Sequence, residues 1–127
     1  MKRVIAIIRI AQMNRTRQAL VDAGFSSFTV RKVLGRGKGQ VDFRVLHGAE
    51  EGHSEAIARL KDDGPMLVPK RMMTIVVNDE DAPKVVQTVI DANQTGQPGD
   101  GKIFIQSIED AVRIRTGERG SDALIQN

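Results

Sequence analysis

The sequence predicts an α+β fold, the ferredoxin-like βαββαβ sandwich, and three observations support this prediction. A chain of 127 residues has the length of a single domain, so we expect one domain over residues 1–127. Strand-like and helix-like periodicities follow one another in the order strand, helix, strand, and this order occurs twice. A long glycine-rich connection separates the two halves. Two such halves in one sheet give four antiparallel strands with both helices on one face.

The first half begins with the β-branched run RVIAIIR at residues 3–9, which is typical of a strand. Apolar residues at helical spacing follow over residues 12–23, with Asn14 as the expected N-cap. Gly24 is expected to end this helix, because glycine readily adopts the left-handed conformation found after a helix C-terminus. The alternating run SFTVRKVL at residues 27–34 predicts the second strand.

The second half repeats this order. The run MLVPKRMMTIVV at residues 66–77 predicts the third strand. A helix is expected to open at Asp79 and to tolerate Pro83 in its first turn. A glycine-rich loop over residues 94–101 then leads into the fourth strand, KIFIQSI at residues 102–108.

The connection between the two halves is about thirty residues long and contains few large apolar residues. Connections of this length are unusual in small domains and indicate a functional loop. We expect a long, exposed and mobile loop over about residues 36–66, with a short helix at 54–61. A polar C-terminal tail is expected over about residues 116–127.

Composition excludes several classes of protein. The absence of cysteine excludes disulfide scaffolds, thiolate zinc sites and cysteine nucleophiles. No apolar run in the sequence approaches the roughly 18 residues of a membrane span, and no signal-peptide cleavage site follows the first strand. We therefore expect a cytoplasmic protein without membrane insertion.

Charge is unevenly distributed along the chain. The formal net charge is +3, yet residues 1–48 carry ten Lys and Arg against two Asp and Glu, whereas residues 49–127 carry nine against fourteen. Local basic clusters suit a compact anionic ligand as well as DNA. With four Phe and no Tyr or Trp, the chain offers few rings for base stacking, so nucleic acid is the least favoured partner.

The predicted sheet has more apolar surface than two helices can cover. The strands at 4–8, 72–77 and 103–108 are apolar at nearly every position, so both faces of the sheet should be apolar. The face without helices is expected to be buried by copies of the same chain in a cyclic homo-oligomer. The architecture alone leaves the number of copies open.

Three segments combine glycine and cations in patterns that suit an anion. GQPGDGK at residues 96–102 matches the GxxxxGK pattern, but it follows a helix, opens a strand and lacks the following Ser or Thr, so we reject a P-loop nucleotidase. It could bind an anion through its backbone N–H groups and Lys102, or simply form a turn. GRGKG at residues 35–39 is the second segment. The third holds Arg113 and Arg115, expected on one side of an extended segment.

No arrangement in the sequence nominates a catalytic site. His47 and His53 lie near several glutamates, but their spacing matches no metal signature, and we expect no metal site. Neither a Ser-His-Asp set nor a carboxylate pair stands out. We therefore expect a binding protein and not an enzyme. A slow ATPase remains an alternative, with Asp100 as the one candidate to activate water.

Four motifs together resemble the PII nitrogen-regulatory signal proteins over nearly the whole chain. They are TVRKVLGRGKG (29–39), HGAEE (47–51), TGQPGDGKIF (95–104) and AVRIRTGE (111–118). The resemblance implies a trimer that binds ATP or ADP in clefts between subunits and 2-oxoglutarate together with Mg-ATP. It also implies that the long loop docks on target proteins.

The resemblance assigns site residues position by position. The implied nucleotide-binding residues are Ile7, Thr29, Gly35, Arg36, Gly37, Lys38, Val76, Gly99, Asp100, Gly101, Lys102, Arg113 and Arg115, the last two from the neighbouring subunit. The implied 2-oxoglutarate-binding residues are Gly37, Gly39, Gln40 and Lys70. The implied partner-binding residues of the long loop are Arg44, His47, Glu50 and Glu51.

The chain departs from the usual family pattern in its long loop. Gly39 stands at the position of a glutamine that helps to bind 2-oxoglutarate, and Gln40 follows it. Glu51 replaces the tyrosine that some members modify, and Ala49 replaces the serine that others phosphorylate. The loop is also longer than usual.

These departures resemble the nitrogen-fixation-associated subgroup, in particular the longer partner of a tandem pair. The resemblance implies a sensor of nitrogen and energy status that binds the dinitrogenase component, as a homotrimer or mixed with a sister chain. The alternative is a sensor that controls an ammonium channel or an assimilation enzyme such as glutamine synthetase.

Overall fold

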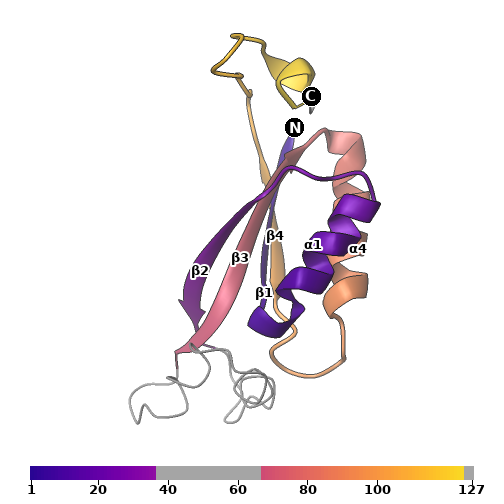
Figure 1. Cartoon of the computed structure of the whole chain (residues 1–127), viewed down its shortest axis with the longest axis vertical. Coiled ribbons are helices and arrows are strands. Elements are labelled where there is room, and N and C mark those ends of the chain that lie inside the picture. The colour runs from indigo at the N-terminus through magenta and orange to yellow at the C-terminus, as the bar shows by residue number, and fades with distance from the viewer. Residues whose placement is uncertain (37–66, 125–127) are drawn as a thin grey trace.

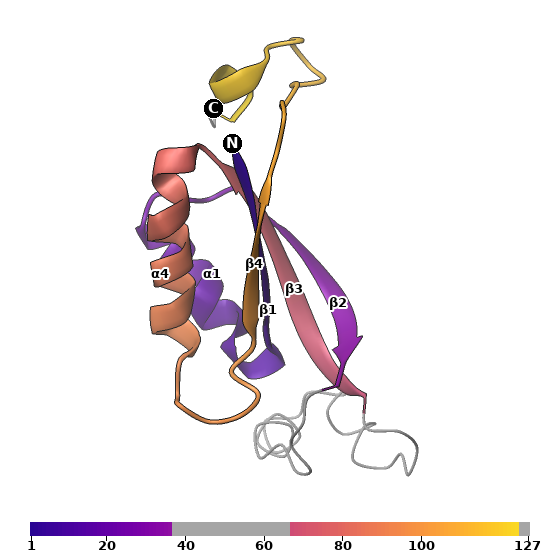
Figure 2. The same ribbon diagram turned by 180° about the vertical axis from the view of Figure 1, so that it is seen from behind.

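The computed structural model describes residues 1–36 and 67–124 and contains the predicted ferredoxin-like fold. Four strands form one antiparallel sheet in the order β2-β3-β1-β4. Their bounds are β1 Lys2–Arg9, β2 Thr29–Gly35, β3 Val68–Val77 and β4 Lys102–Ser107. Both helices, α1 (Met13–Asp22) and α4 (Ala82–Asn93), cover the same face of this sheet (Figures 1 and 2).

The first helix begins differently from the prediction. A 3-10 turn over Ile10–Gln12 precedes α1, and Gln12 occupies its N-cap position without a side-chain hydrogen bond. Asn14 therefore lies within the helix, and its prediction as the N-cap is wrong. Gly24 has a φ of 96° directly after the C-cap residue Ala23, which confirms it as the terminating glycine.

The second helix is preceded by another 3-10 turn, Asp79–Asp81, and Pro83 lies in the first turn of α4 as predicted. The predicted strand ends differ by one or two residues from those of the structure. The predicted long loop and its short helix at 54–61 lie outside the described residues, except Arg36 at the loop's beginning.

The C-terminal segment leaves the sheet after β4. An isolated antiparallel bridge joins Val112 to Arg119, with a turn between them, and a 3-10 helix, Gly120–Leu124, follows. The amide of Gly117 donates to the carbonyl of Arg113 at 2.7 Å. The prediction of an extended segment through Arg113 and Arg115 is therefore wrong, because the chain folds back on itself there.

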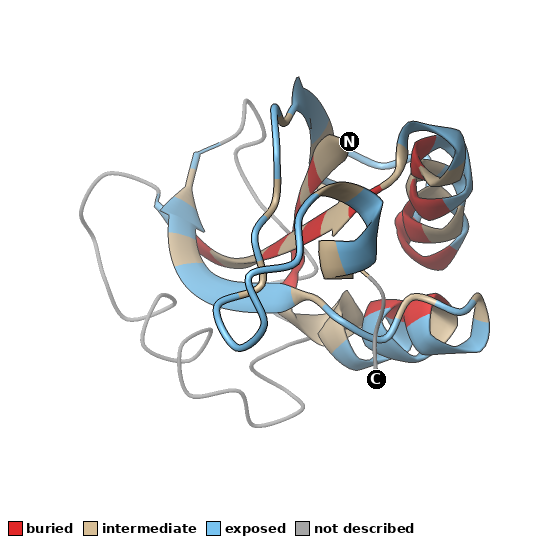
Figure 3. Ribbon diagram, turned by 90° about the horizontal axis from the view of Figure 1, so that it is seen from above, coloured by how far each residue is buried: buried red, intermediate tan, exposed pale blue. Residues whose placement is uncertain are grey.

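The core lies between the sheet and the two helices (Figure 3). Alternate residues of β1 and β3 point to the helices and are buried, as are the apolar positions of α1 and α4 that face them. The core comprises Val4, Ala6, Ile8, Leu20, Met73, Ile75, Val77, Ala82, Val85 and Val89.

The opposite face, which we call the open face, has no helix over it. The strand registers place Ile5 beside Phe104 and Thr74, and Ile7 beside Met72 and Lys102, on this face. Phe104 is 50% exposed. The predicted second apolar face is therefore present, and among the described residues nothing covers it.

Candidate functional site

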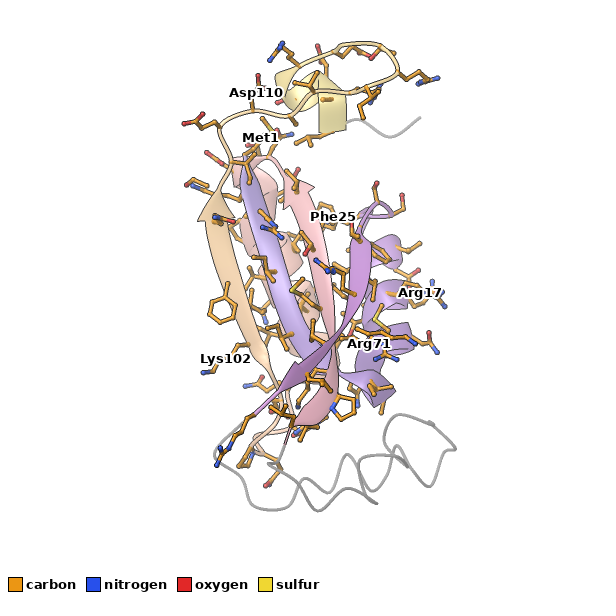
Figure 4. All side chains as sticks on the ribbon, turned by 90° about the vertical axis from the view of Figure 1, so that its left-hand side faces the viewer. Met1, Arg17, Phe25, Arg71, Lys102 and Asp110 are labelled. Atoms are coloured by element: carbon orange, nitrogen blue, oxygen red, sulfur yellow. The ribbon has the colours of Figure 1, made fainter. Side chains whose placement is uncertain are left out.

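One end of the sheet gathers many of the predicted site residues. The strand registers pair Gly35 with Val68, Arg9 with Lys70, and Ile7 with Lys102. Strands β1 and β2 end there, and β3 and β4 begin there. The loop of residues 94–101, which we call the glycine loop, lies beside these strand ends. Figure 4 shows Lys102 at this end of β4 and Asp110 at the other.

Asp100 is the centre of the glycine loop. One carboxylate oxygen, Oδ2, accepts hydrogen bonds from the backbone N–H groups of Thr95 and Gly96, at 2.8 and 2.9 Å. The other, Oδ1, accepts the Thr95 hydroxyl at 2.5 Å and Arg9 Nη1 at 2.6 Å. Both oxygens thus bind the protein itself, and Asp100 holds the loop closed.

Arg9 ties the loop to the sheet. Its residue is 3% exposed, and its Nη2 donates to the carbonyl oxygen of Pro98 at 2.9 Å. Burial raises the pKa of Asp100, but the hydrogen bonds from Thr95, Arg9 and Gly96 together lower it far below the usual range. The carboxylate therefore stays charged, as its pairing with a buried guanidinium requires.

Gly101 allows the loop to touch β1. Its φ is 108°, and a Cβ atom built on it would lie 2.0 Å from the carbonyl oxygen of Ile7. A side chain cannot occupy that space, because the obstructing atom belongs to the backbone of the central strand. The predicted nucleotide residues Ile7 and Gly101 are thus in direct backbone contact.

Cations surround this end of the sheet. Lys70 Nζ donates to the carbonyl oxygen of Gly99 at 3.3 Å, so the residue predicted for 2-oxoglutarate lies beside the glycine loop. Lys102 and Arg36 are exposed nearby, at the beginning of β4 and after β2. The four strands contain eight Lys and Arg and no Asp or Glu, and of these eight only Lys2 and Arg3 lie at the other end of the sheet. Such a charge distribution favours an anionic ligand.

Other predicted site residues lie away from the glycine loop. Thr29 pairs with Thr74 at the beginning of β2, and Val76 pairs with Arg3 near the opposite end of the sheet. Arg113 and Arg115 follow β4 beyond that same end (Figure 1). Arg113 donates to Glu118 Oε1 at 2.9 Å and to the carbonyl of Asp122 at 3.1 Å, whereas Arg115 is exposed. Within one protomer, therefore, Thr29, Val76, Arg113 and Arg115 do not meet the glycine loop.

The remaining predicted site residues lie outside the described residues. For the nucleotide and 2-oxoglutarate these are Gly37, Lys38, Gly39 and Gln40. For the partner they are Arg44, His47, Glu50 and Glu51.

Sequence reasoning missed Arg9 and Thr95. Arg9 follows the apolar run at residues 4–8, and a charged side chain that is buried beside such a run is usually paired with an opposite charge. Thr95 precedes the glycines, where a hydroxyl often bonds a neighbouring backbone or carboxylate. The sequence offered both signals, but neither identifies Asp100 as the partner, since that depends on how the loop returns to β1.

Among residues 1–36 and 67–124, no three His, Cys, Asp or Glu side chains come together as metal ligands could. Of the helices described, none is long and apolar enough to cross a membrane.

Comparison with known proteins relates the whole chain to one family. The family described as nitrogen regulatory protein P-II matches residues 1–118. The chain is 45% identical to "Nitrogen fixation nifHD region GlnB-like protein 2" of Methanobacterium ivanovii, over 98% of this chain and 100% of that protein. It is 44% identical to the protein of the same name from Methanococcus maripaludis, with the same coverage.

Two further comparisons reach beyond the nifHD-region proteins. The chain is 36% identical to "Nitrogen regulatory protein P-II" of Pasteurella multocida, over 98% of this chain and 100% of that protein. Its fold matches a crystal structure of Arabidopsis thaliana PII bound to citrate, with a TM-score of 0.72, 30% identity, and coverage of 99% and 91% of the two chains.

Proposed function

Because the chain belongs to the nitrogen regulatory protein P-II family, we propose that it is a sensor of nitrogen and energy status. It binds ATP or ADP and 2-oxoglutarate, and through its long loop it regulates nitrogenase. The observation that carries this proposal is the end of the sheet where the glycine loop, Lys70 and Lys102 meet. Exposed cations beside a glycine-rich loop are a chemistry that suits a triphosphate.

The nucleotide site is shared between copies of the chain. In support, the glycine loop lies at one end of the protomer, and the segment that holds Arg113 and Arg115 (the Arg113 segment) lies at the other (Figures 1 and 4). The open face offers the apolar surface that copies would bury. A closed trimer, of this chain alone or mixed with a sister chain, brings Arg113 and Arg115 of one copy towards the glycine loop of the next.

Lys70 provides the charge for a carboxylate of 2-oxoglutarate. Its contact with Gly99 O links the effector position to the glycine loop, which supports joint binding of the effector and the nucleotide. Magnesium accompanies ATP. Because both oxygens of Asp100 already accept hydrogen bonds from the protein, we assign the ion to the phosphate oxygens of ATP and not to Asp100.

Calorimetry on the purified assembly tests nucleotide binding. ATP and ADP should release heat on binding, and Lys102→Ala should weaken ATP about 10–100-fold, because a charge-assisted contact to phosphate is lost. Lys84→Ala is the matched control, since Lys84 is an exposed lysine of α4 that lies over the Phe25 ring. Absence of heat with both nucleotides would refute the proposal.

Nitrogenase is the proposed target because the relatives with the highest identities given above are named for the nifHD region. The test is capture of the dinitrogenase component by the immobilised protein, with and without 2-oxoglutarate and Mg-ATP. We expect capture without the effectors and release with them. Equal capture of the dinitrogenase component with and without the effectors would contradict a sensing role.

The name of the Pasteurella relative carries no link to nitrogen fixation, which favours a second candidate function. Under this alternative the chain controls an ammonium channel or glutamine synthetase. The same capture experiment with each of these proteins in place of dinitrogenase separates the two.

We further propose that the chain is not an enzyme. Asp100, the one carboxylate considered for water activation, is held by four donors and has a strongly lowered pKa, so it is a poor general base. Turnover of ATP should therefore be no higher in the wild-type protein than in Lys102→Ala.

A further inference from the structure

The part of the chain after β4 folds back on itself in a short turn. The N–H of Gly117 donates to the carbonyl of Arg113 at 2.7 Å, and Gly117 has a φ of 75°. Glycine suits this position, because residues with a side chain rarely adopt a positive φ. The hydroxyl oxygen of Thr116 accepts the N–H of Glu118 at 3.2 Å. Together these bonds bring Glu118 back beside Arg113.

Glu118 holds Arg113 through both its backbone and its side chain. The backbone N–H of Arg113 donates to the carbonyl of Glu118 at 2.9 Å, and Arg113 Nη1 donates to Glu118 Oε1, also at 2.9 Å. Arg113 Nη2 donates to the carbonyl of Asp122 at 3.1 Å. Both Nη atoms of the guanidinium are therefore bonded within this segment, which fixes the orientation of the guanidinium plane.

Arg113 is the most enclosed of the three arginines in residues 108–124. Its side chain is 16% exposed, whereas that of Arg119 is 70% exposed even though Arg119 Nη1 bonds to Asp110 Oδ2 at 3.1 Å. Arg115 is also exposed. Ion pairs at a protein surface add little to stability. The bond from Arg113 to Glu118 therefore matters more for the position of the guanidinium than for the stability of the fold.

Glu118 belongs to the motif AVRIRTGE at residues 111–118, in which the family resemblance gave a ligand role only to the two arginines. A long side chain loses conformational freedom when it binds a ligand, and a side chain that is already held in place loses less. A guanidinium carries five N–H donors in a rigid fork, so it can bond to a carboxylate and contact a phosphate at the same time. The last part of the motif can therefore serve the arginine that precedes it.

We propose that Glu118 is a positioning residue for Arg113 in the nucleotide site. It fixes the guanidinium in the orientation in which Arg113 contacts the phosphates held by the glycine loop of the next copy, and it does not contact the nucleotide itself. This proposal rests on the shared nucleotide site of the proposed function.

Three substitutions at Glu118 separate positioning from charge. Glu118→Ala removes the acceptor and Glu118→Asp draws it back by one methylene, so both should weaken ATP binding by the assembled protein about three- to tenfold in calorimetry. Glu118→Gln keeps an oxygen in the same place without the charge. Its affinity for ATP should stay within about twofold of wild type, because the hydrogen bond from Arg113 remains.

A double-mutant cycle shows whether Glu118 acts through Arg113. Arg113→Ala should weaken ATP binding, and adding Glu118→Ala to it should cause no further loss. Arg119→Ala is the matched control, because it removes an ion pair of the same segment in which Arg113 takes no part, and it should leave the affinity for ATP unchanged. Urea unfolding should give similar, small losses of stability for Glu118→Ala and Arg119→Ala.

Three outcomes would overturn the proposal. Binding of ATP by Glu118→Ala that equals or exceeds that of wild type would mean that the carboxylate does not position Arg113, or competes with phosphate for it. Wild-type affinity in Glu118→Asp together with a loss in Glu118→Gln would assign the effect to charge. Additive losses in the double variant would mean that Glu118 acts without Arg113.

Failure of the proposed function gives a different result. A wild-type protein that binds no ATP would refute the nucleotide site itself, and the positioning role with it. A wild-type protein that binds ATP, with any of the three outcomes above, would refute the positioning role alone.

Discussion

At the scale of single residues, the candidate site depends on a few side chains that hold the backbone and do not face the ligand. Asp100 and Arg9 close the glycine loop, and Gly101 lets it rest on Ile7. A loop that is already held in one conformation binds an anion without a further ordering cost. Changes at these positions should therefore affect stability and ligand binding together.

Asp100→Asn should lower the free energy of unfolding by about 1.5–3 kcal/mol, because charged hydrogen bonds from Arg9 and Thr95 are lost. The pKa of Asp100 in the folded protein lies below the unfolded value of about 3.9. The stabilisation by its charged carboxylate is therefore complete well above pH 4 and is lost as the pH falls. Urea unfolding at pH 7 and at pH 3 should show the difference between wild type and variant shrinking in acid. Asp91→Asn, whose carboxylate accepts from Gln87 on exposed helix surface, is the control.

Gly101→Ala should destabilise the protein more than Gly96→Ala. Both glycines have positive φ, so each alanine costs about 1–2 kcal/mol in backbone strain. Only at Gly101 would the new Cβ also meet the backbone of β1, whereas nothing lies within 4 Å at Gly96. Equal unfolding free energies for the two variants would mean that the loop does not rest on Ile7.

The sequence predicted which residues gather at the site better than it predicted what they do. Asp100 was expected to contact nucleotide because it lies in a glycine-rich motif. In the structure its oxygens bind Arg9, Thr95 and Gly96. Motif spacing cannot reveal such a role, since it depends on a contact across 91 positions of sequence.

At the scale of elements, α1 and α4 meet through a buried polar pair, Thr16 and Asn93. Thr16→Val should lower the free energy of unfolding by about 1–3 kcal/mol, because it removes an acceptor from a buried amide. Adding Asn93→Leu should restore most of that loss, since replacing both partners with apolar groups can be nearly neutral. Urea denaturation of both single variants and the double variant gives the coupling energy.

Thr88→Val is the matched control for this cycle. Its hydroxyl also donates to a carbonyl four residues earlier, at 2.7 Å, and this bond is exposed. A double variant as unstable as the sum of its single changes would contradict the coupling.

Periodicity predicted the four strands and both helices of the described residues, because each buries an apolar stripe that the sequence displays. It failed at the beginning of α1, where Asn14 looked like a cap, and at Arg113, where alternation suggested an extended segment. In both places hydrogen bonds within short turns, such as Gly117 N–H to Arg113 O, decide the local conformation. The spacing of apolar residues carries no information about such bonds.

At the scale of the whole molecule, the open face is apolar surface that a single chain leaves uncovered. Light scattering should give a mass of about three times 13.9 kDa for the wild-type protein. Phe104→Lys should dissociate the assembly, because it places a charge on apolar surface beside Ile5. Val21→Lys, on the outer side of α1, should leave it intact. A trimeric Phe104→Lys would show that copies do not meet on this face.

The distance between the glycine loop and the Arg113 segment has a genetic consequence. If adjoining copies complete each pocket, every copy belongs to two pockets, one through each end. A copy that is defective at both ends would then impair its neighbours on either side, even when they are intact. Coexpression of damaged and normal chains should therefore produce a dominant defect, and a sister chain that enters the ring would alter ligand response without any change in this sequence.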